Sequence, residues 1–219
     1  MGEELRSTVA EQLMSALHRP RVLRPLAVAA FAALLGAAGP ADSPVNVPEP
    51  TGLYDGPQHG YTPPTLKGAT VVDLAALAAL IADDKPVLLD VVLADRKPQG
   101  LPPGTPWLPS HRSIPGAVWL PGAGVVPLTP EQEAEFFRRI AELTGGDKAK
   151  PIVTFCRPEC WGSWNAGKRL VAAGYSRVHW WPLGVEGWQD TYDTAVVKAD
   201  KTWTYIADEK ATPPAEPQR

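Results

Sequence analysis

Short apolar runs that alternate with helical repeats constrain the fold of this chain more than any other feature. The run Val87–Val92 is apolar and contains β-branched residues without a polar face, which is typical of a strand buried on both sides. The run Pro151–Phe155 has the same character. We predict further strands at residues 69–72, 117–120 and 177–181.

Segments with helical start and stop signals separate these runs. Asp73 is a suitable N-cap for a helix that continues to about Ala82. Thr129 precedes a proline and lies three residues before Gln132, which is a capping-box arrangement, and Gly145 ends that helix. Further helices are predicted at 163–173 and 184–190. Strands that alternate with helices indicate an α/β fold with a mainly parallel sheet flanked by helices.

The N-terminus has the features of a secretory signal peptide. Arg19, Arg21 and Arg24 precede an apolar run at 26–35 and small residues through Ala41. The apolar run is shorter than the roughly 20 residues that span a bilayer, and proline-rich sequence follows it. We therefore expect export to the periplasm, without a stable membrane span after cleavage. An uncleaved N-terminal anchor is the alternative.

These signals divide the chain into four parts. We predict a signal peptide at 1–41, a Pro/Gly-rich arm at 42–66, a domain at 67–192 and a C-terminal tail with weak periodicity at 193–219. Within the domain, residues 95–115 contain six prolines and are predicted to form a long loop.

Charge and metal-ligand spacing exclude two classes of function. The net charge is -3, and no cluster of lysine and arginine is interleaved with aromatic residues, so we expect no nucleic-acid partner. The two cysteines and four histidines do not have the spacing of a zinc site. We expect neither a metal nor another cofactor.

Cys156 is the strongest candidate for chemistry. It follows the strand at 151–155, at the edge of a parallel sheet where ligands bind. A thiolate there would face loop N–H groups and the positive end of the next helix, with Arg157 as a nearby positive charge, and these lower a thiol pKa. We predict that Cys156 is a nucleophile. Asp90 ends a neighbouring strand, and a structural role is favoured over one in orienting the loop.

Four segments in this order resemble the rhodanese family. The resemblance covers about residues 69–190, and it implies a rhodanese-like fold in which Cys156 takes up sulfane sulfur as a persulfide and passes it to a thiol acceptor. The segments are Leu89-Asp90-Val91, Ser113-Ile114-Pro115-Gly116-Ala117, Phe155-Cys156-Arg157 and Gly184-Val185-Glu186-Gly187-Trp188.

A narrower resemblance is to the exported CXXCW motif proteins, named for a cysteine-cysteine-tryptophan motif and for association with PQQ-dependent catabolism. It implies a periplasmic accessory to alcohol oxidation, with a quinoprotein dehydrogenase or its cytochrome as partner; it does not imply that this chain binds PQQ. The residues that carry it include Cys156, Cys160-Trp161, Ser163-Trp164-Asn165-Ala166 and Trp181-Pro182.

The loop departs from the usual rhodanese pattern. The usual loop has a glycine near its middle and ends in Arg or Thr, which helps to bind an anionic donor; here Glu159 and Trp161 occupy that stretch, and the loop is one residue longer. Because the carboxylate of Glu159 would repel thiosulfate, we expect a different small sulfur donor or thiol acceptor. We predict that Cys156 and Cys160 are catalytic and that the substrate contacts are made by Arg157, Pro158, Glu159, Trp161, Gly162 and Ser163.

Several roles stay open for the cysteines and the aromatic residues. A separation of four allows a disulfide, which an oxidising compartment favours, so a structural disulfide and an inert scaffold compete with sulfur transfer. A non-catalytic accessory protein is the corresponding alternative function. Trp161 and Trp164 could wall a pocket or form a partner surface. His111 and His179 are interpreted as packing residues.

Overall fold

The computed structural model describes residues 45–95, 100, 102 and 104–203. The predicted signal peptide at 1–41 therefore lies outside the described residues. Within the described part of the chain, no helix has both the length and the apolar character needed to cross a membrane.

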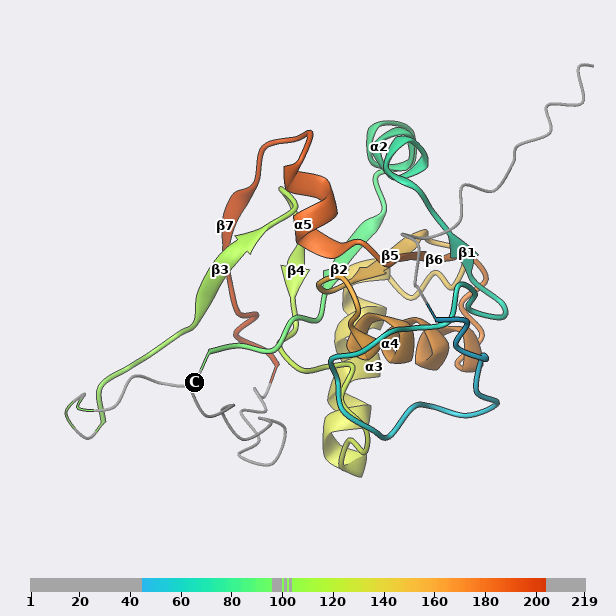
Figure 1. Ribbon diagram of the computed structural model, residues 1–219. Coiled ribbons are helices and arrows are strands. Elements are labelled where there is room, and N and C mark those ends of the chain that lie inside the picture. Colours follow the sequence, from blue (N-terminus) through green and yellow to red (C-terminus); the bar gives the residue numbers. More distant parts are fainter. Residues whose placement is uncertain (1–44, 96–99, 101, 103, 204–219) are drawn as a thin grey trace, which may run out of the picture. The chain divides into compact units, whose positions relative to one another are not determined.

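A five-stranded parallel sheet forms the centre of the fold (Figure 1). Its strand order is β1-β6-β5-β2-β4. Every residue of β2 and of β5 is buried, which explains why these two central strands are uniformly apolar except at Asp90 and Thr154. The strands are β1 (Thr70–Val71), β2 (Val87–Asp90), β4 (Val118–Trp119), β5 (Ile152–Phe155) and β6 (Val178–Trp181).

Helices cover both faces of the sheet, as Figure 1 shows. On one face, α3 (Pro130–Thr144) and α4 (Trp161–Ala172) pack through Phe136, Ile140 and Leu170 against residues such as Leu89. On the other face, α2 (Leu74–Asp83) and α5 (Gly184–Gln189) pack through Leu77, Val185 and Trp188 against β5 and β6. The predicted α/β class with a mainly parallel sheet is confirmed.

The helix signals in the sequence act as predicted at α2 and α3. Asp73 caps α2 by accepting a 2.8 Å hydrogen bond from the N–H of Ala76. Thr129 and Gln132 form a reciprocal capping box at the start of α3, and Gly145 ends that helix with a left-handed φ of 66°. The helix predicted at 163–173 begins two residues earlier, at Trp161.

A second, two-stranded sheet corrects the prediction that residues 95–115 form a long loop, because β3 (Ser110–Ser113) lies within that range. This strand pairs antiparallel with β7 (Ala195–Lys198). Arg112 also donates to the hydroxyl of Thr194, 82 residues away in the sequence, at 3.1 Å. Because β3 is polar and its partner is distant, neither strand has a local signal that would have predicted it.

The Pro/Gly-rich arm lies against α4. Leu66 is buried in a cluster with Trp161, Trp164 and Trp180, and Tyr54 packs against that cluster. The indole N–H of Trp164 donates to the carbonyl of Thr65 at 2.9 Å. The arm thus contributes to a third apolar cluster, although its sequence carries no periodic pattern.

His179 in β6 is a partly buried histidine. Neither ring nitrogen has a hydrogen-bond partner among the described residues, and both nitrogens are shielded from solvent. Burial lowers the pKa of His179, and the charge of Arg177 lowers it further, against a smaller opposing effect of Asp84. The packing role predicted for His179 fits this environment.

We expect His179 to make the protein less stable in mild acid. Its folded-state pKa lies below the unfolded value of about 6.5, so the unfolded state binds the proton first as the pH falls below that value. Its contribution is therefore complete above pH ~6.5 and is lost progressively below it. Urea unfolding of the wild type and of His179→Gln at pH 7.5 and 5.5 should show the smaller loss in the variant. An equal loss in both proteins would contradict this role.

Candidate functional site

A disulfide closes the loop that follows β5. It joins Cys156, the first residue after the strand, to Cys160, and the two Cα atoms are 6.2 Å apart. That distance lies within the usual range of about 4.4–6.8 Å. The structure thus contains the disulfide that the separation of four allows.

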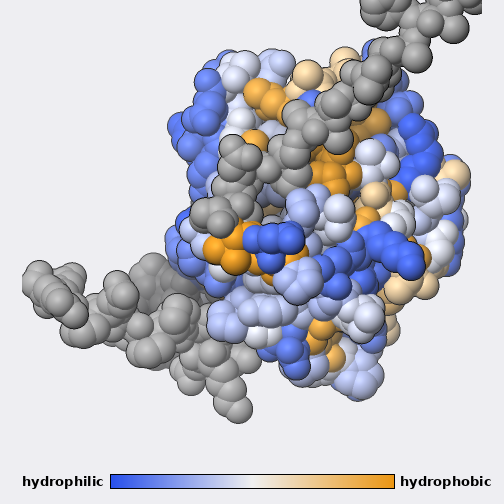
Figure 2. Space-filling model, turned by 45° about the vertical axis from the view of Figure 1, so that its right-hand side comes forward, coloured by the Kyte–Doolittle hydropathy of each residue, from blue (hydrophilic) through white to orange (hydrophobic). Residues whose placement is uncertain are grey.

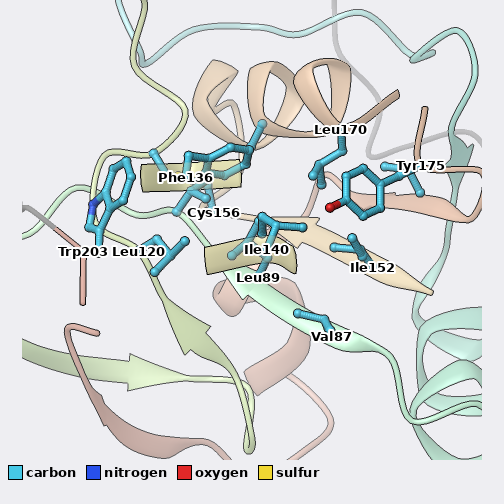
Figure 3. Packing of buried hydrophobic residues seen from close by; sticks show 14 of the residues in the cluster. Val87, Leu89, Leu120, Phe136, Ile140, Ile152, Cys156, Leu170, Tyr175 and Trp203 are labelled. Atoms are coloured by element: carbon cyan, nitrogen blue, oxygen red, sulfur yellow. The ribbon is translucent and has the colours of Figure 1, made fainter. Parts of the chain in front are cut away.

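Cys156 lies at the base of the loop. Only 4% of its surface is exposed, and it belongs to the same apolar cluster as Phe136 and Leu120 (Figure 3). The backbone N–H of Val185 donates to its carbonyl at 3.2 Å. At Gly184, which has a φ of 59°, a Cβ atom would lie 2.4 Å from that carbonyl oxygen, so only glycine allows this approach.

Cys160 occupies the N-cap position of α4. Its φ and ψ are -118° and 113°, and its side chain makes no capping hydrogen bond. It is only partly buried. Cys160 lies at the positive end of the helix, which corrects the prediction for Cys156, because α4 begins at Trp161 and not near Ser163. The disulfide connects Cys156 to Cys160 at that end of the helix.

The N-terminal arm pairs with the cysteine loop. His59 and Cys160 form an antiparallel bridge. The N–H of Gly60 donates to the carbonyl of Glu159 at 2.8 Å, and the N–H of Trp161 donates to the carbonyl of Gln58 at 2.9 Å. These bonds hold the arm beside the disulfide, and Glu159 adopts a left-handed φ of 54° between them.

Side chains of α4 fasten the arm further along its length. The ring of Tyr54 stacks on that of Trp161 with centroids 3.9 Å apart. The side-chain amide of Asn165 accepts from the backbone N–H of Tyr54 and donates to its carbonyl, both at 2.9 Å. It also donates to the carbonyl of Gly124 at 3.1 Å. Asn165 therefore joins the arm, α4 and the 120s loop.

A cavity of about 320 Å³ opens beside the disulfide. Three segments distant in the sequence form its walls: the arm, the segment that follows β2, and the cysteine loop. The lining residues are Gln58, His59, Val91, Val92, Leu93, Ala94, Asp95, Cys156, Arg157 and Cys160. Its volume is at the lower end of the usual range for small-molecule sites, roughly 300–1,000 Å³.

The predicted loop residues divide into two groups. Only the two cysteines and Arg157 line the cavity, and the side chain of Arg157 is 62% exposed, 3.8 Å from the carboxylate of Glu186. Such an exposed pair adds little stability. Pro158 and Glu159 lie on the loop outside the residues that line the cavity.

The other predicted contacts are packed inside the protein. Trp161 is 4% exposed, and the hydroxyl of Ser163 accepts from the indole N–H of Trp180 at 3.1 Å while donating to the carbonyl of Cys160 at 3.2 Å. Gly162 lies against the backbone of Gly124. These side chains position the loop and do not line the cavity.

A partner surface formed by Trp161 and Trp164 is excluded. Both side chains are buried, Trp164 completely, because the arm covers them. Figure 2 shows hydrophobic residues on one face as separate patches between hydrophilic ones. The large hydrophobic residues exposed among those the structure describes are Val45, Tyr61, Leu108, Tyr192 and Val196.

Sequence reasoning missed two of the three cavity walls. Gln58 and His59 lie in a segment without any periodic pattern, and Leu93–Asp95 follow a strand without a motif. Only the parallel pairing of β2 with β5, which sets Asp90 opposite Phe155, indicates that the segment after Asp90 lies beside Cys156.

Asp90 is a structural carboxylate of the neighbouring strand. It is completely buried and accepts from the hydroxyl of Ser113 at 2.5 Å and from the N–H of Val92 at 2.9 Å. The Nε2 atom of His111 lies 3.0 Å from Asp90 Oδ2, close enough for an ion pair, but at an angle outside hydrogen-bond geometry. Asp90 thus holds β3 and the cavity wall at Val92 to the main sheet.

We expect Asp90→Ala to lower the free energy of unfolding by about 3 kcal/mol, since each buried donor left without an acceptor costs about 1–3 kcal/mol. Asp90→Asn keeps one acceptor and should lose less. The measurement is urea unfolding, with the exposed Asp55→Ala as the matched control. A loss no larger than that of the control would show that the Asp90 contacts contribute nothing.

No group of three or more potential metal ligands occurs among the described residues. The cavity brings together the two sulfurs of the disulfide and the charged residues Arg157 and Asp95.

Comparisons with known proteins identify the family. The family model described as Rhodanese-like domain matches residues 73–191, which include every element from α2 to α5. No curated protein matches the chain. An uncharacterized protein from Saccharomyces cerevisiae, solved at atomic resolution, is 18% identical to this chain, with a TM-score of 0.33. The similarity covers 55% of this chain and 91% of the yeast protein. Because the family model matches more than half of the sequence, the chain belongs to the rhodanese-like domain family.

Proposed function

We propose that this chain is an exported rhodanese-like protein that carries out sulfur transfer or thiol redox chemistry through Cys156 and Cys160. The observation that carries the proposal is the disulfide between these residues at the wall of a cavity of about 320 Å³. A buried structural disulfide needs no such opening, whereas a reactive one needs access for a donor or acceptor.

The two chemistries are connected by one balanced sequence. A reduced cysteine thiolate attacks the outer sulfur of a small persulfide donor, R–S–SH, which leaves R–S⁻ and a protein persulfide. The second cysteine thiolate then attacks the inner sulfur, releases HS⁻ and forms the Cys156–Cys160 disulfide. The sulfane sulfur is reduced and the dithiol is oxidised by two electrons. Two equivalents of an external thiol return the protein to the dithiol. An acceptor thiol that takes the sulfur first leaves the dithiol unchanged.

Ordinary thiosulfate transfer is disfavoured by charge. Glu159 is exposed on the loop, and Asp95 lines the cavity. Arg157 is a positive charge at the rim, but it lies beside Glu186. We therefore propose that the donor is not a doubly charged anion such as thiosulfate.

Intact mass spectrometry tests the proposed chemistry. We expect the purified oxidised protein to gain about 2 Da on reduction, and the reduced protein incubated with a small persulfide to carry an additional ~32 Da or to return to the disulfide with release of sulfide. A variant with Cys156→Ser and Cys160→Ser should do neither. If the reduced wild type releases no more sulfide than this double variant and gains no sulfur, the proposed chemistry fails.

The physiological setting follows from the narrower motif resemblance. We propose that the protein is periplasmic and accessory to PQQ-dependent alcohol oxidation, with a quinoprotein dehydrogenase or its cytochrome as partner. The support is the Cys160-Trp161 pair with Ser163, Trp164 and Asn165, residues whose side chains hold the arm and the loop. Deletion of the gene should impair growth on alcohols but not on succinate. Equal growth on both would contradict the proposal.

A non-catalytic accessory role is the second candidate function. It is favoured by the burial of Cys156, which is 4% exposed, because a buried disulfide can tie the end of β5 to the start of α4 without any reaction. The double cysteine variant separates the two functions: restored growth on alcohols supports the accessory role, and loss of growth with a folded variant supports the chemistry.

A further inference from the structure

The two sulfurs of the disulfide are not equivalent. Cys156 is 4% exposed and enclosed by an apolar cluster, whereas Cys160 is only partly buried and lies at the rim, paired with His59 of the arm. We propose that Cys160 is the sulfur that exchanges with a small external thiol and that Cys156 is its internal partner. The inference rests on the proposed function and reverses the order expected from the position of Cys156 after β5.

Access to the two sulfurs differs because a thiolate attacks a disulfide along the S–S axis, from beyond the sulfur that it attacks. Cys156 is buried in the cluster that includes Phe136 and Leu120 (Figure 3), and Cys160 packs against that cluster while it stays partly exposed. Both cysteines line the cavity, whose other walls are the arm at Gln58–His59 and the segment Val91–Asp95. Because more of Cys160 is open to solvent, an external thiol reaches Cys160 more readily than Cys156.

The helix end favours the same assignment in the reduced protein. Cys160 is the N-cap of a 12-residue helix, so its sulfur lies at the positive end of α4. The positive end of a helix favours the thiolate form of a cysteine. Cys156 lies four residues earlier, among apolar side chains that favour the neutral thiol. Cys160 is therefore the better nucleophile toward an incoming disulfide or persulfide.

One effect opposes the assignment. The thiol that ionises more readily is also the better leaving group, which favours attack on Cys156 with release of Cys160. Leaving-group strength changes a rate only gradually, whereas the near-complete burial of Cys156 hinders the approach of an attacking thiol itself. Access therefore decides the direction.

The exchange then has two balanced steps. An external thiolate, R–S⁻, attacks Cys160, the bond between the two cysteines breaks, and Cys156 leaves as a thiolate that takes a proton. A second external thiolate attacks the sulfur of R in the mixed disulfide, releases Cys160 as a thiolate and forms R–S–S–R. The protein gains two electrons and the two thiols lose them. In the reverse direction, Cys156 resolves a mixed disulfide on Cys160.

The test in the wild type uses glutathione as the probe. The oxidised protein is mixed with a small excess of reduced glutathione, quenched with acid within seconds and digested at low pH, so that the cysteine that carries glutathione can be identified by mass. We expect the adduct on Cys160. An adduct predominantly on Cys156 would overturn the proposal.

Single-cysteine variants test independently which of the two sulfurs reacts with an external reagent. Cys156→Ser leaves Cys160 alone, and Cys160→Ser leaves Cys156 alone; each is treated with 5,5′-dithiobis(2-nitrobenzoate) at pH 7. We expect Cys160 to react about tenfold faster or more. Equal rates, or a faster Cys156, would overturn the proposal. A disulfide that glutathione cannot open, together with no sulfide release, would refute the proposed function, and the variant rates would still rank the two sulfurs.

Discussion

Replacing Trp161 with alanine is expected to lower the free energy of unfolding by about 3–5 kcal/mol, the usual cost of removing a buried aromatic side chain. Trp161 is 4% exposed, stacks on Tyr54 with an interplanar angle of 16°, and meets the edge of Trp164 at 5.5 Å. Its loss would leave a cavity between the arm and α4 that neither segment can fill. The measurement is equilibrium unfolding in urea.

The same variant should also loosen the arm. Tyr54 would keep its two bonds to Asn165, but it would lose the ring on which it stacks. We therefore expect limited proteolysis to cut within residues 45–66 of Trp161→Ala faster than in the wild type. Trp161→Phe retains a ring for stacking and is the matched control, with a smaller loss of stability. Equal cleavage in all three proteins would show that the stacking does not hold the arm.

The position of the arm matters for function because the arm forms one wall of the candidate site. Gln58 and His59 line the cavity, and the bonds that set them beside Cys160 are made by backbone groups of Glu159, Gly60 and Trp161. Trp161, which was predicted to contact the substrate, therefore acts indirectly: it holds the arm that forms one wall of the cavity.

The sequence predicted the elements that depend on local chemistry. The uniformly apolar runs became the central strands β2 and β5, because burial on both faces requires apolar residues at every position. Asp73 and Thr129 began their helices and Gly145 ended one as expected, because a cap depends on a few adjacent residues. The position of the cysteine loop followed from the strand-to-helix order alone.

What the sequence could not predict depends on contacts between distant segments. The β3–β7 pair joins two short strands that are far apart in the chain, and β3 is too polar to be distinguished from the proline-rich sequence around it. The arm has no periodicity because it is held by stacking, by backbone pairing with the loop and by the amide of Asn165. The start of α4 was misplaced because Trp161 and Gly162 are not typical first residues of a helix, and Cys160 gives no capping bond.

Replacing Gly124 with alanine is expected to destabilise the protein strongly, because among the described glycines its added Cβ would make the shortest contact. A Cβ atom at Gly124 would lie 2.0 Å from the carbonyl oxygen and 2.4 Å from the Cα of Gly162, in the first turn of α4. Both are backbone atoms, so no side chain can rotate to make room. The loop that contains Gly124 would have to move away from α4.

That movement would break contacts beyond the glycine itself. The carbonyl of Gly124 accepts from Asn165, and the carbonyls of Ala123 and Val125 accept from the buried guanidinium of Arg169 at 2.9 and 2.6 Å. Burial already lowers the pKa of Arg169 to about 10, so the loss of these acceptors would leave a buried charge without compensation. We expect Gly124→Ala to cost more than about 3 kcal/mol, the upper part of the range for overpacked sites.

The matched control for Gly124→Ala is Gly52→Ala in the arm. Gly52 has no heavy atom within 4 Å of the position of an added Cβ, and its φ is not in the left-handed region. The control should therefore change the free energy of unfolding by less than about 0.5 kcal/mol, as surface substitutions usually do. Because Gly162 precedes Ser163 and follows Cys160 by two residues, displacement of the helix start should also change the rate at which glutathione opens the disulfide. Gly124→Ala with wild-type stability would show that the 120s loop does not fix the start of α4, and the position of Cys160 at the helix end would then need another cause.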